Sequence, residues 1–213
     1  MIDLLMQGQV ALFAIILFAI IFSLTCHEFG HAAMATVLGD PTAQQAGRLT
    51  LNPVVHIDPL GLLMVVMVGF GYAKPVPFNP RYLKQTWGSA AVAFAGPAMN
   101  LLLSIVAVNL LVAGVQYDIE ALSEPGPRTA LLFLAQINVL LMLFNLIPLG
   151  PLDGHHIMQS LLPPDLSRRY STFNDKFGAG IFLVLIVLSV MGLPVFRFLS
   201  QVSNFILPLL TFI

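Results

Sequence analysis

Two histidines and a glutamate near the N-terminus form the pattern with the clearest chemical meaning. His27 and His31 enclose Glu28 in the sequence His-Glu-Phe-Gly-His. Residues four apart in a helix lie about 40° apart around its axis and about 6 Å apart along it. Both imidazoles can therefore bind one zinc ion, while Glu28 is placed to act on a water molecule bound to that metal.

The apolar surroundings of this pattern favour a functional interpretation. Residues 8–38 form a long and mostly apolar segment. Ionisable side chains in such a segment are costly to bury unless they are paired or bound to a metal. We therefore interpret His27 and His31 as ligands of one zinc ion per chain.

A hydrolytic zinc site normally has three protein ligands and one open position for water, so a third ligand must come from elsewhere. Asp153 is the best candidate because, apart from Glu28, it is the only acidic residue in or beside an apolar segment. A carboxylate also offsets part of the charge of a metal dication where the dielectric constant is low. His155 and His156 follow so closely that they are alternatives for this position.

The composition indicates the environment of this site. Of the 213 residues, 58% are hydrophobic and 9% are charged, whereas soluble domains carry about 25% charged residues. Such a chain cannot cover its surface in water, so we predict an integral membrane protein. The formal net charge of −1 gives no indication of a nucleic-acid partner, and the single cysteine, Cys26, excludes a disulfide within the chain.

The hydropathy pattern predicts an all-α polytopic membrane protein with about six membrane-embedded helices. A spanning helix needs about 20 mostly apolar residues. The predicted segments are 8–38, 89–115, 129–147 and 179–193, together with the shorter segment 59–70 and residues 196–213. Gly96-Pro97 should kink the second of these and open space. We expect one embedded domain over residues 1–213, with a catalytic core at about 8–160 and C-terminal helices at about 178–213.

Two proline-rich segments should be extended. They are Arg48–Pro53 and Lys74–Pro80, which lie between the first and the third long helix. Because proline disfavours helix interiors, we predict extended segments or edge strands there. An exposed strand edge would offer hydrogen bonds to an unwound peptide substrate.

The distribution of basic residues predicts the orientation in the cell membrane. The connections 39–88 and 163–177 are rich in lysine and arginine, whereas the connection 116–128 is mainly acidic. The first two should therefore be cytoplasmic, and the third and the N-terminus should be external. His27, His31 and Asp153 then all lie toward the cytoplasmic side.

At this point the chain resembles a known family. A His-Glu-x-x-His helix followed by Asn145-x-x-Pro148-x-x-x-x-Asp153-Gly154 resembles the site-2 protease family of intramembrane zinc metalloproteases, peptidase family M50. The segment from Gly96 to Asn100 matches the family's G-x-x-x-N element. The resemblance spans roughly residues 20 to 160, and paired motifs at this separation are highly specific. The chain resembles a short member that lacks a PDZ-like insert.

The resemblance implies hydrolysis of peptide bonds in or near transmembrane segments. The partners would be the lipid bilayer and a membrane protein with a transmembrane helix. It also implies a role for each matched residue: zinc ligands at His27, His31 and Asp153, a catalytic base at Glu28, and substrate positioning or site stabilisation at Asn100 and Asn145.

Two other function classes make different demands on the sequence. A metal transporter or channel would need further ionisable residues along a path through the membrane, and the predicted spans contain almost none. A proteolytically inactive relative that acts as a scaffold would be expected to lack Glu28 or a ligand, and all of these residues are present.

Overall fold

The protein, seen here as a computed structural model, is described over residues 1–69, 71–191 and 195–213. Its long helices are α2 (Val10–Val37), α6 (Gly88–Gln116), α8 (Pro125–Asn145) and α10 (Pro164–Val190). The shorter elements are α1 (Ile2–Met6), α3 (Thr42–Gln45), α4 (Pro53–His56), α5 (Pro59–Val68), α7 (Glu120–Ser123), α9 (Asp153–Leu161) and α11 (Val195–Ile206), with 3-10 turns η1 (Pro80–Tyr82) and η2 (Leu207–Leu210).

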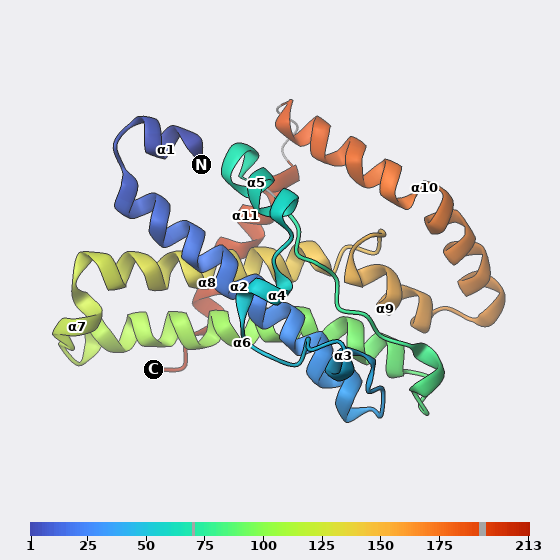
Figure 1. Ribbon diagram of the computed structural model, residues 1–213. Coiled ribbons are helices and arrows are strands. Elements are labelled where there is room, and N and C mark those ends of the chain that lie inside the picture. Colours follow the sequence, from blue (N-terminus) through green and yellow to red (C-terminus); the bar gives the residue numbers. More distant parts are fainter. Residues whose placement is uncertain (70, 192–194) are drawn as a thin grey trace.

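The centre of the molecule consists of α2, α6 and α8. Helices α6 and α8 run side by side in opposite directions, and α2 crosses them (Figure 1). Helix α9 packs beside α6, and α11 packs against α8. Helix α10 stands at the edge of the molecule, where it contacts α9 and α11. The central three helices and α9 are therefore the elements that can hold a shared site.

Small residues allow the central helices to approach closely. A Cβ atom added to Gly30 of α2 would lie 2.6 Å from Met99 Cγ and 2.7 Å from the carbonyl oxygen of Ala95, both on α6. Between α6 and α8, the buried cluster contains Ala107, Val108 and Ala135. Without a large hydrophobic driving force inside a bilayer, such close packing is a main source of helix association.

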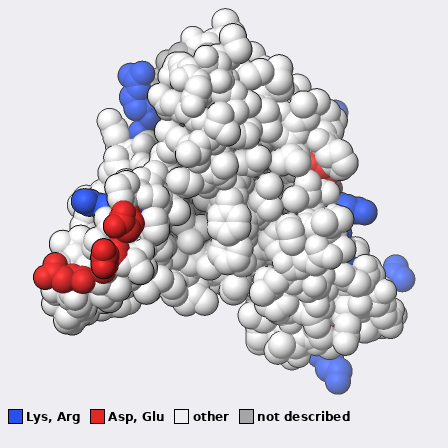
Figure 2. All heavy atoms as spheres, turned by 60° about the vertical axis from the view of Figure 1, so that its left-hand side comes forward, with Lys and Arg blue, Asp and Glu red and all other residues white. Residues whose placement is uncertain are grey.

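The long helices suit a membrane. All four are long and apolar enough to cross a bilayer, and the face in Figure 2 is largely uncharged, with most of its visible acidic side chains gathered at the lower left. This agrees with a multi-pass membrane protein. Helices α5 and α11 have 10 and 12 residues, or about 15 and 18 Å, so neither crosses a core of about 30 Å alone. The prediction of about six embedded helices is thus supported for four spans only.

The predicted edge strands are not present among the described residues. The only pairing there is a single antiparallel bridge between Ile57 and Ala73. Pro53 begins α4 instead of preventing a helix, because proline suits the first helical position and the Asn52 side chain caps the turn by accepting from the Val54 N–H. Residues 74–79 are extended but have no strand partner.

Two other boundaries differ from the prediction. Helix α10 begins at Pro164, well before residue 179, because its first half is polar and helical at the same time; hydropathy reports only the apolar half. The predicted ends at Leu193 and Phe70 lie outside the described residues. Helix α6 continues through Pro97.

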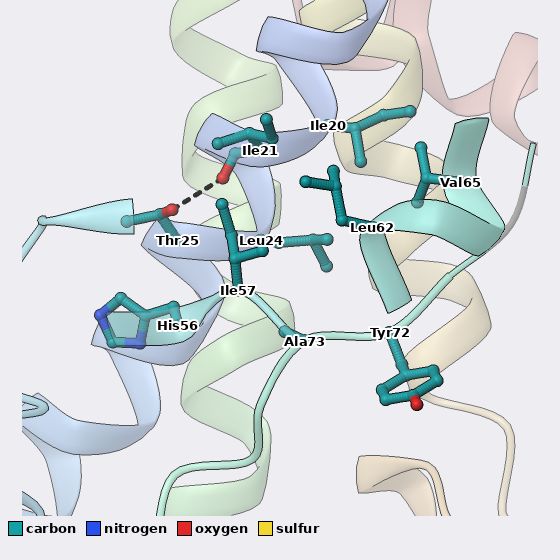
Figure 3. Close-up of a pocket in the computed structure, with 10 residues that line it drawn as sticks. All are labelled: Ile20, Ile21, Leu24, Thr25, His56, Ile57, Leu62, Val65, Tyr72 and Ala73. Atoms are coloured by element: carbon teal, nitrogen blue, oxygen red, sulfur yellow. Dashed lines mark hydrogen bonds between the residues drawn. The ribbon is translucent and has the colours of Figure 1, made fainter. Parts of the chain in front are cut away.

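Helix α5 and the chain that follows it pack against one face of α2. Figure 3 shows Leu62 and Val65 of α5 facing Ile20 and Leu24 of α2, with Tyr72 and Ala73 passing below them. Gly61 lets the following chain pass close to α5, since a Cβ atom at Gly61 would lie 2.0 Å from the carbonyl oxygen of Tyr72. This packing brings residues 72–76 alongside the part of α2 that carries Glu28.

Candidate metal centre

Three predicted ligand atoms converge where α2 meets the start of α9. The Nε2 atoms of His27 and His31 are 3.0 Å apart. Asp153 Oδ2 lies 3.2 Å from Nε2 of His27, and Asp153 Oδ1 lies 3.4 Å from Nε2 of His31. Tetrahedral zinc with bonds of about 2.0–2.1 Å separates its ligand atoms by about 3.3 Å. The convergence therefore has the dimensions of a zinc site.

The other nitrogen of each imidazole has its own acceptor. His27 Nδ1 donates to Asn100 Oδ1 at 2.6 Å, and His31 Nδ1 donates to the Val92 carbonyl oxygen at 2.7 Å. Because a carbonyl oxygen only accepts, both Nδ1 atoms carry the proton. Both Nε2 lone pairs are then free to face a metal. In metal-binding histidines, a hydrogen bond from the other ring nitrogen fixes the tautomer in the same way.

The residues present fit a zinc ion. Asp153 Oδ2 is buried and has no hydrogen-bond partner among the described residues, which costs about 1–3 kcal/mol or more for a charged group. A cation between the carboxylate and the two imidazoles would satisfy it. His27, His31 and Asp153 form the set of His, Cys, Asp and Glu side chains in the described part of the chain whose ligand atoms all lie within 4.8 Å of one another.

A chain of buried amides supports His27. Asn100 on α6 donates to Asn138 Oδ1 on α8 at 2.8 Å, and Asn138 donates to Ser23 Oγ on α2 at 2.8 Å. All three side chains are fully buried. The prediction that Asn100 stabilises the site thus has a geometric basis, whereas sequence reasoning missed Asn138. Its position among apolar residues of a spanning helix was the signal that could have found it.

Gly96 touches the imidazoles directly. A Cβ atom at this position would lie 2.4 Å from His31 Nε2 and 2.7 Å from His27 Cε1. The expectation that Gly96-Pro97 opens space therefore needs correction. Glycine is required here because α6 passes directly beside both rings, and any side chain would displace them.

Asp153 is placed by contacts on both sides of it. Gly154 packs against the chain that precedes α9, where a Cβ atom would lie 2.4 Å from the carbonyl oxygens of Leu146 and Ile147. The N–H of Gly150 donates to Asn174 Oδ1 on α10 at 2.9 Å. These contacts fix the loop between α8 and α9, and so direct the first carboxylate of α9 toward α2.

Glu28 contacts the extended segment of residues 74–79. Its Oε2 accepts a hydrogen bond from the Val76 backbone N–H at 3.2 Å. The far end of the segment is held by Asp40, which accepts from the Asn79 N–H at 2.5 Å and from Thr42. Burial raises the pKa of Asp40, but hydrogen bonds from Thr42 and Asn79 outweigh it and hold the pKa below its usual range.

The alternatives for the third ligand lie outside the convergence of ligand atoms. His155 is buried against Tyr170, with 5.2 Å between ring centroids. His156 is exposed, with its ring centroid 6.1 Å from that of Phe78. Neither belongs to the group of ligand atoms within 4.8 Å, so the geometry favours Asp153.

The remaining polar candidates have local partners. Asn145 donates to the carbonyl oxygen of Leu141 at 3.0 Å, and its side chain lines the cavity described below. His56 is buried beside Arg48 and does not line that cavity. Cys26 is a buried free thiol.

A cavity of about 500 Å³ gives access to the site. Its polar lining includes Glu28, the three convergent residues and Asn145. Its apolar lining comes from α5 and the chain after it, from the central helices α2, α6 and α8, and from α10, which contributes Phe182 and Ile186. An apolar chamber with a few polar groups at one point is typical of a substrate site.

Comparison with known proteins gives two kinds of match. The sequence profile of Peptidase family M50 matches residues 15–189. A Bacillus subtilis protein named "Putative zinc metalloprotease YwhC" is 42% identical over 171 residues, which cover 79% of this chain and 78% of that protein. Rip2 of Mycolicibacterium smegmatis, named in the same way, is 31% identical, with 84% of this chain and 69% of that protein covered.

A more distant relative is archaeal. The protein named "Zinc metalloprotease MJ0392" from Methanocaldococcus jannaschii is 25% identical over 187 residues, covering 87% of this chain and 46% of that protein. No solved structure matches the chain.

Proposed function

The chain belongs to peptidase family M50 and is a metalloprotease, and from that premise we propose that it hydrolyses peptide bonds in or near transmembrane segments of membrane proteins. In this proposal His27, His31 and Asp153 hold one zinc ion and Glu28 is the general base. The observation that carries it is the convergence of the three ligand atoms within 4.8 Å, beside Glu28 and at the wall of an apolar cavity.

The chemistry of the chain's own residues follows from their positions. A zinc ion bound there would acidify a coordinated water molecule and polarise the scissile carbonyl group. Glu28 lies one residue from His27, so its carboxylate can accept a proton from the attacking water and deliver it to the leaving amine nitrogen. The Val76 N–H holds one carboxylate oxygen, which leaves the other free for the proton.

The surroundings of the site support a membrane-embedded substrate. His27, Glu28 and His31 lie inside α2, one of the four helices suited to a bilayer. The cavity wall consists mainly of apolar side chains, which would receive an apolar peptide. A transmembrane helix would have to unwind locally there, because its peptide bonds are otherwise engaged in helical hydrogen bonds.

We also propose that the site faces the cytoplasmic side of the cell membrane. Four spans would place the connections 38–87 and 146–163 on one side and residues 117–124 on the other. Lys74, Arg81 and Lys84 in the first connection are exposed, whereas Arg48 is buried. Single cysteines at positions 82 and 120 of a Cys26→Ala protein, labelled with an impermeant reagent in intact cells, test this. Labelling at 82 alone would reverse the topology.

The alternative function classes find little support. Among the described residues of α6 there is no Asp, Glu, Lys, Arg or His, so no path of ionisable groups extends from the site through this helix, as transport would require. A proteolytically inactive scaffold is disfavoured by the presence of Glu28 and of three convergent ligands.

Replacing Glu28 tests the proposed function most directly. Zinc content and cleavage of a tagged single-span membrane protein would be measured for wild type and Glu28→Gln. We expect full zinc occupancy in both and a loss of turnover of about 10²–10⁴-fold in Glu28→Gln, the usual contribution of general base catalysis. Glu120→Gln, an exposed glutamate on α7, is the matched control and should behave as wild type. Near wild-type turnover by zinc-loaded Glu28→Gln would refute the mechanism.

A further inference from the structure

Arg48 is a buried cation without a carboxylate partner in the described part of the chain. Arg48 lies in the chain after α3, and it is 5% exposed. The ion pairs between the described residues join His27 and His31 to Asp153 and do not include it. Burying an unpaired charge is costly, so a buried arginine must obtain compensation from hydrogen bonds. The hydrogen-bond partners of this guanidinium therefore indicate its role.

The guanidinium donates to two consecutive backbone carbonyl groups, a pair of hydrogen bonds that we call the grip. Arg48 Nη1 donates to the Pro75 carbonyl oxygen at 3.1 Å, and Nη2 donates to the Lys74 carbonyl oxygen. His56 Nδ1 lies 3.4 Å from Nη2. Since His56 Nε2 donates to the Thr50 carbonyl oxygen at 2.8 Å, its Nδ1 is the acceptor in a neutral ring. Three acceptors thus surround the cation.

The gripped carbonyls belong to the segment that meets Glu28. The N–H of Lys74 donates to the His56 carbonyl oxygen at 2.7 Å, so this end of the segment is held through both backbone groups. The next residue after the grip is Val76, whose N–H is the partner of Glu28. Pro75 and Pro77 flank Val76 and have no N–H. The direction of a single amide therefore depends on how the Lys74–Pro75 carbonyls are held.

The charge of Arg48 also acts on Glu28. Burial lowers the pKa of the Arg48 guanidinium, and attraction by the Glu28 carboxylate counteracts this. The cation thus lies within electrostatic reach of the proposed base. Figure 3 shows the His56 ring pointing away from the apolar side chains of Leu24 and Leu62, which keeps the polar grip separate from the apolar packing.

We propose that Arg48 is a positioning residue for Glu28, and that its grip on the Lys74–Pro75 carbonyls holds the Val76 amide against the Glu28 carboxylate. The inference rests on the proposed role of Glu28 as general base. Arginine is suited to this task because its rigid fork reaches two acceptors at once, whereas lysine offers a single point charge. Arg48 touches neither the ligand atoms nor the cavity.

Three full-length, zinc-loaded variants in detergent test the proposal: Arg48→Gln, Arg48→Lys and the control Arg81→Gln, which removes an exposed charge from the same connection. Hydrogen exchange of the peptide covering residues 74–79 reports few amides, because Pro75 and Pro77 contribute none. Zinc content, kcat and KM are measured on the same samples.

In Arg48→Gln we expect exchange in the 74–79 peptide to rise about tenfold or more, since the local opening is no longer opposed. The kcat should fall about 10–100-fold with KM changed by less than about twofold, because the loss acts on the base and not on substrate binding. Zinc content should be unchanged. Arg48→Lys should give intermediate values for exchange and kcat, and Arg81→Gln should match wild type.

Several outcomes would overturn the proposal. Unchanged exchange or unchanged kcat in Arg48→Gln would show that the grip is dispensable. Zinc loss, or faster exchange throughout α2 and α6, would assign Arg48 a purely structural role, and a raised KM with constant kcat would assign it to substrate binding. If Arg48→Gln does not fold, the same criteria apply to Arg48→Lys. If wild type itself lacks peptidase activity, the proposed function fails, while the exchange measurement still decides whether the grip exists.

Discussion

The two histidines and Glu28 share one stretch of α2, yet their partners come from two differently constructed regions. The helical region, formed by α6, α8 and α9, supplies Asn100, the Val92 carbonyl and Asp153 to the histidines. The extended region, residues 73–79, supplies the Val76 amide to Glu28. The first is held by close helix packing, the second by a few hydrogen bonds at its two ends.

This difference implies that zinc binding and base positioning can be perturbed separately. In the helical region, a change moves packed side chains that contact several neighbours, so it should alter the ligands and the affinity for metal. In the extended region, a change releases one tether of a segment that lies outside the helices. It should alter turnover while zinc remains bound. Substitutions in each region test whether zinc binding and base positioning are separable.

Asp153→Ala should have the largest effect, because it removes a ligand and the only negative charge among the three. We expect bound zinc to fall by about tenfold or more, with loss of activity, since removing a partner from a buried charged group is strongly destabilising. Zinc per chain, measured in the purified protein, checks this.

His155→Ala and His156→Ala are the matched comparisons for Asp153→Ala. Both should retain most of the zinc and activity, because neither imidazole lies among the convergent ligand atoms. Full occupancy in Asp153→Ala together with depletion in one histidine variant would assign the third ligand to that histidine.

Asn138→Leu should have an intermediate effect on the helical region. Asn100 would lose the partner that orients its amide toward His27, and loss of an outer hydrogen bond to a metal ligand typically lowers metal affinity about 10–100-fold. Zinc affinity, measured by competition with a chelator, tests this.

The control for Asn138→Leu is Asn109→Leu. Asn109 is also an amide on a central helix, but it bonds to Leu210 and Phe212 near the C-terminus. The Asn109→Leu substitution should leave zinc affinity unchanged. Equal losses in both variants would indicate general destabilisation of the helices and would remove the special role of Asn138.

Asp40→Asn should have the smallest effect on the metal and a visible one on the extended region. The carboxylate accepts from Asn79 N–H with Oδ2 and from Thr42 with Oδ1. An asparagine amide has only one oxygen and cannot accept from both residues, so the far end of the segment loosens at a cost of about 1–3 kcal/mol. Zinc content should not change, and turnover should fall by less than in the Arg48→Gln variant.

The pH dependence of stability gives a second measurement for Asp40. Because its pKa in the folded protein is below the usual value, its stabilising contribution is complete above the usual carboxyl pKa of about 3.9 and is lost as the pH falls below it. The stability difference between wild type and Asp40→Asn should therefore be constant near neutral pH and shrink in acid. A difference that grows in acid would contradict the assignment.

The sequence pointed to the residues whose side chains converge in the structure because its signals are local or compositional. His27, Glu28 and His31 lie close together on any helix that contains them, and a carboxylate beside an apolar segment made Asp153 the candidate third ligand. It predicted the non-helical connections less well. The prolines predict extended segments or edge strands, whereas Pro53 and Pro80 begin short helical turns, where an N–H would have no helical partner in any case.

Hydropathy and helical spacing depend only on neighbouring residues, so the amino-acid sequence is enough to predict a membrane protein with a two-histidine, one-glutamate pattern on a single helix. The groups that complete the surroundings of these residues are apparent only in the folded chain. Asn138, Gly96, Val76 and Arg48 lie between 20 and 111 residues from His27 or Glu28 in the chain. No local period relates them to the histidines, and the crossing of helices and the tethering of one extended segment bring them there.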